Sequence, residues 1–288
     1  PDNNPPKSKI EWKKRQFRQA RRSQEYEILL SVVIPCIGEE AFFYRALASA
    51  TKWNAPGLEI IVVNDGGPRI SWNKLLCAIP SWIDLKLIQG PNSGLGAARN
   101  AGKSVARGEF VLFLDSDDEI TVETAHKVCR ELTQLGLDWA LARSEIHIDA
   151  LGITFPNNFY PFCTHTGAKT LTPQYVFSNW GVDTSWPIHS AVIRRSSCPN
   201  FEKLNRGEDY LFWLCLLSSY GFQHSSNELL ATYHWHPNQM TVDSKLQGDG
   251  LRNAAKIAHD RFEWVSNQDL NRRLKTVNFL TGVGRLRQ

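Results

Sequence analysis

The sequence predicts an α/β fold in which a mostly parallel, Rossmann-like central sheet is flanked by helices on both faces. Short apolar runs rich in β-branched residues alternate with helix-like segments through the first half of the chain. Such alternation is typical of parallel strands, because the crossover helices cover both faces of the sheet. The 288 residues, 42% of them hydrophobic, suffice for one large core or two modest ones.

The expected elements follow one another in order along the chain. The apolar, strand-like runs lie at Leu29–Pro35, Leu58–Val63, Leu85–Ile88 and Phe110–Leu114. The helix-like segments between them lie at residues 40–52, 71–78 and 94–106. An apolar helix is expected at Leu211–Leu217, and an apolar stripe over residues 248–266 predicts a helix that packs on the core or on a second subunit.

The basic residues are concentrated at the N-terminus. Residues 7–22 carry eight Lys or Arg against Glu11 alone, a net charge of +7, in a chain whose net charge is only +4. A basic helix over residues 8–24 is compatible with loose packing on the domain, or with attraction to anionic lipid or an acidic partner. Nucleic acid is not expected as a partner, because no recognition motif accompanies the charge and the rest of the chain is slightly acidic.

Cysteine spacing and hydropathy indicate a cytoplasmic protein. None of the six cysteines stands in a CxxC pair, which favours a reduced compartment over a zinc site or a disulfide framework. No apolar run approaches the roughly 20 residues that span a bilayer. The chain begins with Pro1, so we expect a fragment or a processed product. Any contact with a membrane would be peripheral, at its inner face, through residues 7–22.

An acidic turn, Asp115-Ser116-Asp117-Asp118, follows the fourth expected strand. Three carboxylates in four residues repel one another unless a cation lies among them, and carboxylates suit Mg²⁺ or Mn²⁺ bound together with phosphates. The alternative is a turn in which Asp118 caps the next helix. Asp65 ends the second strand on the same edge of the sheet, where ligands bind in such folds, and this favours the metal interpretation.

A helix start with two glycines and an arginine lies at residues 92–102. Glycines allow close backbone approach and a helix N-terminus attracts anions, while Arg99 offers a charge-assisted contact to a phosphate. The alternative is a small-residue helix packed tightly on the sheet, with Arg99 paired to a structural acid. The two interpretations are compatible.

Glu208 and Asp209 precede the apolar helix at Leu211–Leu217. A carboxylate here can act as a general base, although acids in a first helical turn are also stabilised by the helix dipole alone. His234 and His236 are spaced to share one side of a strand, which suits either a metal or a structural role. Trp186 and His189 are candidates for the acceptor side, with the hydrophobic core as the alternative for the aromatic ring.

Six segments stand in a fixed order over residues 29–240. They are SVVIP at 31–35, VVNDGG at 62–67, NSGLGAARNAG at 92–102, FLDSDD at 113–118, GEDYLFW at 207–213 and YHWHPNQMT at 233–241. In this order they resemble the family 2 glycosyltransferases, which have the GT-A fold. The resemblance implies a nucleotide-sugar-binding half at residues 29–119 and an acceptor-binding half at 120–241. The charge pattern adds a basic N-terminal arm at residues 1–28, and the apolar stripe adds a C-terminal helical extension at 242–288.

The resemblance also implies roles for individual residues. Asp65 would read the base, uracil in members that use UDP-sugars, and Arg99 would lie near the base or the diphosphate. Asp115 would contact the ribose or the metal, and Asp117, the second acid of the Asp-X-Asp motif, would bind the metal. Asp209 would be the catalytic base with Glu208 beside it, and His236 a ligand of the diphosphate or metal. The implied donor-binding set is Pro35, Cys36, Glu39, Asp65, Asn92, Gly94, Arg99, Asp115 and Ser116.

Two positions depart from the family pattern. The usual Thr-Tyr-Asn after the first strand is Cys36-Ile37-Gly38 here, so the aromatic ring that often stacks on the base is missing at Ile37. The first acid of the usual Asp-Asp-Gly-Ser is Asn64. The base is therefore held differently, or the nucleotide differs.

The expected activity is transfer of a sugar from a nucleotide-diphosphate sugar, UDP-linked in the first instance, to a hydroxyl of a glycan or glycolipid. The resemblance implies inversion at the anomeric carbon and assistance by Mn²⁺ or Mg²⁺. Three alternatives stay open at this point: a non-catalytic sugar-nucleotide-binding module, a nucleotidyltransferase, and a scaffold that binds anionic surfaces through the basic arm.

Overall fold

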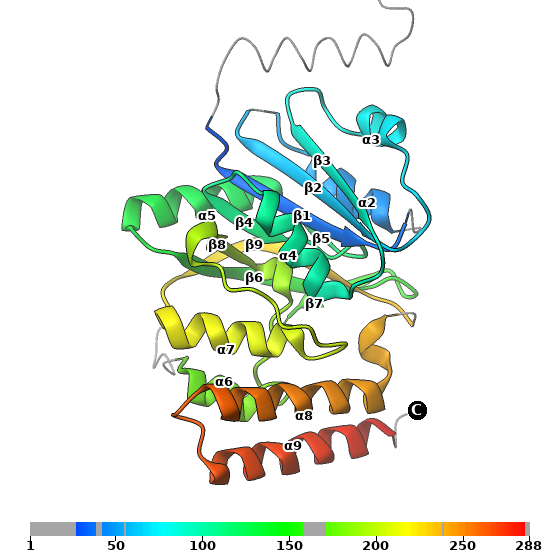
Figure 1. Cartoon of the computed structure of the whole chain (residues 1–288). Helices are drawn as coiled ribbons and strands as arrows, with labels where there is room; N and C mark the ends of the chain where they lie inside the picture. Colours follow the sequence, from blue (N-terminus) through cyan, green and yellow to red (C-terminus); the bar gives the residue numbers. More distant parts are fainter. Residues whose placement is uncertain (1–26, 39–41, 55, 158–170, 238, 286–288) are drawn as a thin grey trace, which may run out of the picture.

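The computed structural model describes residues 27–38, 42–54, 56–157, 171–237 and 239–285. It shows a mixed α/β protein in which helices pack on both faces of one curled sheet (Figure 1). In the view of Figure 1, α7, α8 and α9 lie in successive layers below the sheet. The basic helix expected at residues 8–24 falls outside the described residues.

The sheet has the order β3-β2-β1-β4-β8-β6-β9-β5, and β7 pairs with β6. The strands are β1 Leu30–Cys36, β2 Leu58–Asp65, β3 Asp84–Gly90, β4 Phe110–Phe113, β5 Glu119–Ile120, β6 Trp139–Ile148, β7 Ile153–Pro156, β8 Ala191–Arg194 and β9 Ser225–Trp235. Strands β1 to β4 are parallel, whereas β8 runs antiparallel to both β4 and β6. The sheet therefore continues without a break from the predicted donor half into the predicted acceptor half.

The helices confirm most of the sequence assignments. They are α2 Phe43–Ala50, α3 Trp72–Ala78, α4 Leu95–Val105, α5 Val122–Leu135, α6 Pro173–Asn179, α7 Glu208–Tyr220, α8 Ser244–Arg261 and α9 Asn267–Arg285. Two expectations differ. Helix α8 ends at Arg261, so Val265 reaches the core from the loop that follows. Helix α5 begins after Thr121, so Asp118 does not cap it and that alternative is wrong.

Two hydrophobic clusters lie on opposite faces of the sheet because side chains alternate along each buried strand. Val33 of β1 and Ile61 of β2 face the cluster beneath α4 and α7, while their neighbours Val32 and Ile60 face the cluster beneath α2 and α5. Every residue of β1 and β2 is buried, as expected for parallel strands covered on both sides.

The C-terminal helices extend the first of these clusters. Ala254, Ala255 and Ala258 of α8 are fully buried in the cluster that includes α7, so α8 packs on the core of its own chain. The approach is close at the start of α7, where Gly207 adopts φ 78°, and a Cβ there would meet the Gly250 carbonyl oxygen at 2.8 Å. Helix α8 thereby supports the turn that carries Glu208 and Asp209. Within the described residues, no helix combines the length and apolarity that crossing a membrane requires.

Candidate active site

The polar strand ends meet at one edge of the sheet, as the sequence predicts. Strands β1, β2 and β4 are parallel neighbours, so the Cys36 end, Asp65 and the turn at residues 115–118 open on the same side. The Leu114 amide still donates to the carbonyl oxygen of Val33, which ties the beginning of the acidic turn to β1.

Arg99 of α4 is fully buried and joins the acidic turn to the start of α7. Its Nη2 donates to Asp115 Oδ1 at 2.7 Å, its Nη1 donates to Asp209 Oδ1 at 2.6 Å, and Glu208 Oε1 lies 3.4 Å from the same Nη1. Burial alone would lower the pKa of Arg99, but the three carboxylates raise it above its ordinary value. Arg99 is therefore a permanent cation paired with acids. Asp115 and Asp209 lie 16 and 110 positions after Arg99 in the sequence, so no local spacing reveals that the three residues meet.

Asp209 is the acid of α7 that solvent reaches, as Asp115 is on the acidic turn. Its side chain is 30% exposed, whereas Glu208 is buried. The N-cap of α7 is Gly207, which has no side chain, and both acids lie in the first helical turn and contact Arg99. Burial within the site raises the pKa of Asp209 to about 7, Arg99 opposes the shift, and Glu208 and Asp115 add to it. A carboxylate with this pKa can exchange a proton near neutral pH.

Asp65 connects the end of β2 to the start of α4. Its two carboxylate oxygens accept hydrogen bonds from the amides of Ser93 and Gly94, at 2.7 and 2.9 Å. These amides are therefore engaged by Asp65, although each carboxylate oxygen keeps a second lone pair for a ligand. Asn92 is exposed beside them, and nothing lies within 4 Å of the position that a Cβ on Gly94 would occupy.

The residues that depart from the family pattern have clear positions. Asn64 Oδ1 accepts from the amides of Gly38 and Gly67, and its Nδ2 donates to the Pro68 carbonyl oxygen at 2.8 Å. Asn64 thus holds the loops after β1 and β2 together. Ile37 is 49% exposed where the family places an aromatic ring. Pro35 and Cys36 are buried at the end of β1, and Glu39 lies outside the described residues.

The predicted metal ligands Asp115, Asp117 and His236 do not form a single three-ligand group. His236 Nε2 lies 3.2 Å from Asp117 Oδ2, while Asp115 is held by Arg99. Among the described residues, the group at this edge with ligand atoms within 4.8 Å of one another is Asp115, Asp118 and His189. The turn places Asp117 with His236 and Asp115 with Arg99, so the predicted set is divided between two partners.

Asp118 and His189 are buried beneath the turn, and sequence reasoning did not assign them to a metal. His189 Nδ1 lies 3.3 Å from Asp118 Oδ2, and within the described structure neither ring nitrogen of His189 has a hydrogen-bond partner. Burial lowers the pKa of His189 to about 4, so the ring is neutral, and burial raises the pKa of Asp118 well above its ordinary value. Burial likewise raises the pKa of Asp117, with Asp115 adding to the shift. Neutral imidazole beside clustered carboxylates fits a divalent cation, Mn²⁺ better than Mg²⁺ because Mg²⁺ prefers oxygen ligands.

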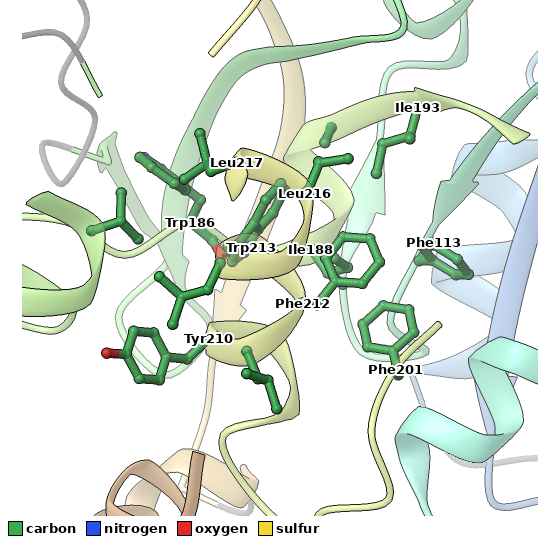
Figure 2. Close-up of a cluster of buried hydrophobic side chains, with 14 of the residues drawn as sticks. Phe113, Trp186, Ile188, Ile193, Phe201, Tyr210, Phe212, Trp213, Leu216 and Leu217 are labelled. Carbon is green, nitrogen blue, oxygen red and sulfur yellow. Dashed lines mark hydrogen bonds between the residues drawn. The ribbon is translucent and has the colours of Figure 1, made fainter. Parts of the chain in front are cut away.

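The two residues predicted for the acceptor side lie in the interior. Trp186 is 1% exposed and packs edge-on against Trp180 and Trp213, with ring centroids 5.7 and 5.6 Å away. Figure 2 shows Trp186 and Trp213 within the hydrophobic cluster. A sugar ring cannot stack on an indole in this position, so the acceptor assignment of Trp186 is corrected to a core role. His189 is fully buried and faces the acidic turn instead.

The sequence matches the family model described as Glycosyl transferase family 2 over residues 31–198. A protein from Haemophilus influenzae described as an uncharacterized glycosyltransferase is 33% identical over 199 residues, covering 65% of this chain and 72% of that protein. The uncharacterized glycosyltransferase EpsJ of Bacillus subtilis is 31% identical over 110 residues, 38% of this chain. This alignment covers 32% of EpsJ, so the chain spans only about a third of that relative's length.

Solved structures show the same fold at lower identity. The TarS fragment 1–349 of S. aureus in complex with UDP-GlcNAc matches with a TM-score of 0.61 and 20% identity, covering 85% of this chain and 70% of that one. The mannosyltransferase PcManGT of Pyrobaculum calidifontis, in complex with GDP-Man and Mn²⁺, matches with a TM-score of 0.60 and 12% identity, covering 95% and 80%. The GT-A fold is thereby confirmed, and with the family model matching more than half of its residues, the chain belongs to glycosyl transferase family 2.

Proposed function

We propose that the protein transfers a sugar from a nucleotide-diphosphate sugar to a hydroxyl group of a glycan or glycolipid. The observation that carries the proposal is the convergence on Arg99 of Asp115 from the strand-end turn and Asp209 from α7. One acid lies at the edge where donors bind in open α/β sheets, and the other is partly open to solvent. A donor and an acceptor bound at these two acids would be neighbours.

The donor proposal rests on the loops after β1, β2 and β4. Asp65 at the end of β2 and the exposed Asn92 before α4 are the candidates to contact the base and ribose, and Asp115 retains one oxygen that Arg99 does not use. UDP-sugar is the first candidate, because TarS, of similar fold, has been crystallised with UDP-GlcNAc. Since PcManGT was crystallised with GDP-Man, the base itself must be tested. Exposed Ile37 would contact the base through an aliphatic surface.

We propose that Mn²⁺ or Mg²⁺ assists the reaction, held by residues of the acidic turn. Asp117 with His236 and Asp115 with Asp118 and His189 are the candidate ligands. When bound, the cation would offset the negative charge that grows on the leaving nucleoside diphosphate.

Asp209 is the proposed general base. Its raised pKa keeps it basic enough to take a proton from a sugar hydroxyl, and Arg99 fixes the orientation of the carboxylate. The hydroxyl would attack the anomeric carbon on the face opposite the leaving group, which inverts the configuration. No side chain is required as a nucleophile in this scheme.

The decisive experiment is Asp209→Asn, assayed for sugar transfer with a radiolabelled donor. The variant keeps the shape of the side chain but cannot accept the proton, so we expect transfer to fall by about 10²–10⁴-fold while donor affinity is retained. Glu228→Gln is the matched control, since Glu228 is an exposed acid paired with Lys127. Near wild-type transfer by Asp209→Asn would remove Asp209 from the base role.

A non-catalytic sugar-nucleotide-binding module is the rival function. It predicts donor binding with no acceptor-dependent release of nucleotide. Thermal-shift measurements with UDP- and GDP-sugars, each with Mn²⁺ or Mg²⁺, identify the donor first, because ligands that bind the folded state raise its melting temperature. The nucleotide-release assay is then run with that donor, with and without candidate acceptors.

We further propose that the protein is cytoplasmic and that residues 7–22 contact an anionic membrane peripherally. The support is their net charge of +7 in a chain of net charge +4. Deleting residues 1–24 should abolish co-sedimentation with phosphatidylglycerol vesicles and leave turnover of a water-soluble acceptor intact. If the protein is instead a scaffold that binds anionic surfaces through its basic N-terminal arm, the same deletion would remove its only activity.

A further inference from the structure

A second group of metal-ligating side chains lies at the ends of β6 and β9, away from Arg99. His147 of β6 and His234 of β9 are paired residues of adjacent parallel strands, so their side chains lie on the same face. Asp149 follows two residues after His147 and extends the same face of β6. The ligand atoms of these three side chains lie within 4.8 Å of one another.

The individual distances suit one shared ion. Asp149 Oδ1 is 2.7 Å from His234 Nδ1 and 3.8 Å from His147 Nε2. Ligand atoms bound tetrahedrally at about 2.0–2.1 Å from a zinc ion are roughly 3.3 Å apart. The two observed distances lie on either side of this value, so a shift of the Asp149 carboxylate by roughly half an ångström would accommodate the ion.

The outer nitrogen of each histidine lies beside a polar group of the kind that orients a metal ligand. His147 Nδ1 contacts Thr154 Oγ1 of β7 at 2.7 Å. His234 Nε2 lies 3.0 Å from Glu119 Oε1 of β5, without the geometry of a hydrogen bond, so a small rotation of the ring or the carboxylate would complete the pair. When these outer nitrogens carry the protons, His147 Nε2 and His234 Nδ1 both present lone pairs toward Asp149. Metal-bound histidines almost always donate their other N–H in this way.

We propose that His147, His234 and Asp149 bind a divalent transition-metal ion of the zinc type, at a site separate from the donor site. Two imidazole nitrogens and one carboxylate favour Zn²⁺ or Co²⁺ over Mg²⁺, which prefers oxygen ligands. Thr154 is the positioning residue for His147, and Glu119 is the nearest acceptor for His234. Thr154, His147 and His234 form one row across β7, β6 and β9, and Glu119 of β5 pairs with Thr232, two residues before His234.

Arg45 of α2 is the feature that opposes a cation at this site. Its Nη1 lies 3.4 Å from both oxygens of Asp149. However, its Nη2 donates to the Asp117 carbonyl oxygen at 2.6 Å and its guanidinium lies over the Phe42 ring, so its position is fixed by other contacts. Glu119 and Asp149 both lie beside Arg45, so two carboxylates face one guanidinium and a net negative charge is left for the ion. The competing explanation is a network in which Arg45 pairs with these two acids and His234 contacts Asp149, with no ion bound.

Occupation of the site would also affect the acidic turn. The His234 amide donates to Asp118 Oδ1 at 2.7 Å, and His236, two residues further on, reaches Asp117. An ion on His234 would hold this end of β9 firmly against the turn. The inference does not depend on the proposed sugar transfer.

The test uses Co²⁺ as a spectroscopic probe of the full chain, with excess Mg²⁺ present to fill the carboxylate-rich donor site. We expect a saturable visible absorption of one Co²⁺ per chain with nitrogen ligands, displaced by Zn²⁺. His147→Asn should weaken Co²⁺ binding by more than tenfold, and Thr154→Val by roughly tenfold through loss of the outer hydrogen bond. His224→Asn is the matched control, because His224 also lies beside one acid, Glu131.

Three results would overturn the site. They are a folded wild-type protein without the absorption, an absorption that His147→Asn leaves unchanged, and an absorption that disappears in Asp117→Asn, which would assign it to the donor site. Circular dichroism reports whether each variant folds. If His147→Asn does not fold, the more conservative Thr154→Val decides, and unchanged Co²⁺ affinity in that variant counts against the proposal.

Discussion

Two arginines gather carboxylates near the carboxyl edge of the sheet, and they do so in different ways. Arg99 is fully buried and meets Asp115 and Asp209 at 2.7 and 2.6 Å. Arg45 is 28% exposed and meets Glu119 and Asp149 at 3.6 and 3.4 Å. A buried charge has no water around it, so it is stabilised only by its ion-pair partners. A partly exposed charge can exchange an ion-pair partner for water at little cost in free energy. The Arg99 cluster is thus a fixed part of the site. In the Arg45 cluster the acids can turn toward a ligand while Arg45 keeps its contacts with Asp117 and Phe42.

The largest expected effect comes from removing the buried cation. Arg99→Met keeps most of the volume but leaves carboxylates without their counter-charge, so the free energy of unfolding should fall by about 3–5 kcal/mol. Sugar transfer should fall roughly 10²-fold or more, because Asp209 and Asp115 lose their common anchor. Urea unfolding and the donor assay measure the two effects.

Arg99→Lys separates charge from geometry in the same cluster. A lysine keeps the charge but cannot reach Asp115 and Asp209 with a planar fork, so stability should recover more than activity. Equal recovery of both would show that Arg99 supplies only charge to the site.

The pH dependence of turnover tests the state of Asp209. A general base works when deprotonated, and since the pKa of Asp209 is raised to about 7, kcat/KM should drop about tenfold for each pH unit below that value. Folding stability should respond in the opposite direction. The folded state holds the proton between the ordinary value of 3.8 and about 7 while the unfolded state releases it, so the contribution of Asp209 to stability declines as pH rises through this window. A kcat/KM that increases together with folding stability as the pH is lowered would contradict the assignment of Asp209 as the general base.

The support that α8 gives to Asp209 can be measured with two glycines. Gly207→Ala places a Cβ 2.8 Å from the Gly250 carbonyl oxygen and forces alanine into a left-handed conformation. Gly136→Ala has the same conformational penalty, about 1–2 kcal/mol, but open space around the new Cβ. We expect Gly207→Ala to cost about 1–3 kcal/mol more than the control because of the clash. Equal losses of folding free energy in the two variants would mean that α8 moves away from the new Cβ without a measurable cost.

The smallest expected effect is Arg45→Met. Its ion pairs are long and partly exposed, so the loss of stability should be about 1 kcal/mol. Because Arg45 opposes a cation beside Asp149, the same variant should bind Co²⁺ at the histidine site more tightly. A loss as large as that of Arg99→Met would remove the distinction between the two arginines.

Much of the fold follows from local sequence pattern. The runs at Leu29–Pro35 and Leu58–Val63 are apolar apart from Ser31 and Glu59, as expected for strands buried on both faces, and every residue of β1 and β2 is buried. The positions of Asp65 and Asp115 at the ends of their strands follow from the same pattern. The stripe at residues 248–266 predicts helix α8, which begins earlier, at Ser244, and ends at Arg261, so that Phe262 and Val265 continue the apolar spacing but pack from a loop.

The partners of the site residues were beyond local pattern. Trp186 and His189 carry no signal that distinguishes an acceptor surface from the interior. Trp186 packs against Trp213 of α7, and His189 lies beneath the acidic turn next to Asp118. The His147-Ile148-Asp149 alternation did offer a signal, since it places an acid two residues after a histidine at the end of a strand. Its significance depends on His234, which lies 87 positions later in the sequence than His147 and is adjacent only because β6 pairs with β9.

The sequence by itself determined the α/β class, the order of the strands along the chain and the acids that stand at their ends, because hydrophobic periodicity and strand-end chemistry are local properties. The tertiary structure alone decided which charges meet. Arg99 could have faced a phosphate or a structural acid, and only the packing of α4 against α7 brings it to Asp115 and Asp209 at once. Contacts between distant segments depend on how helices and strands pack, and that packing is a property of the whole core.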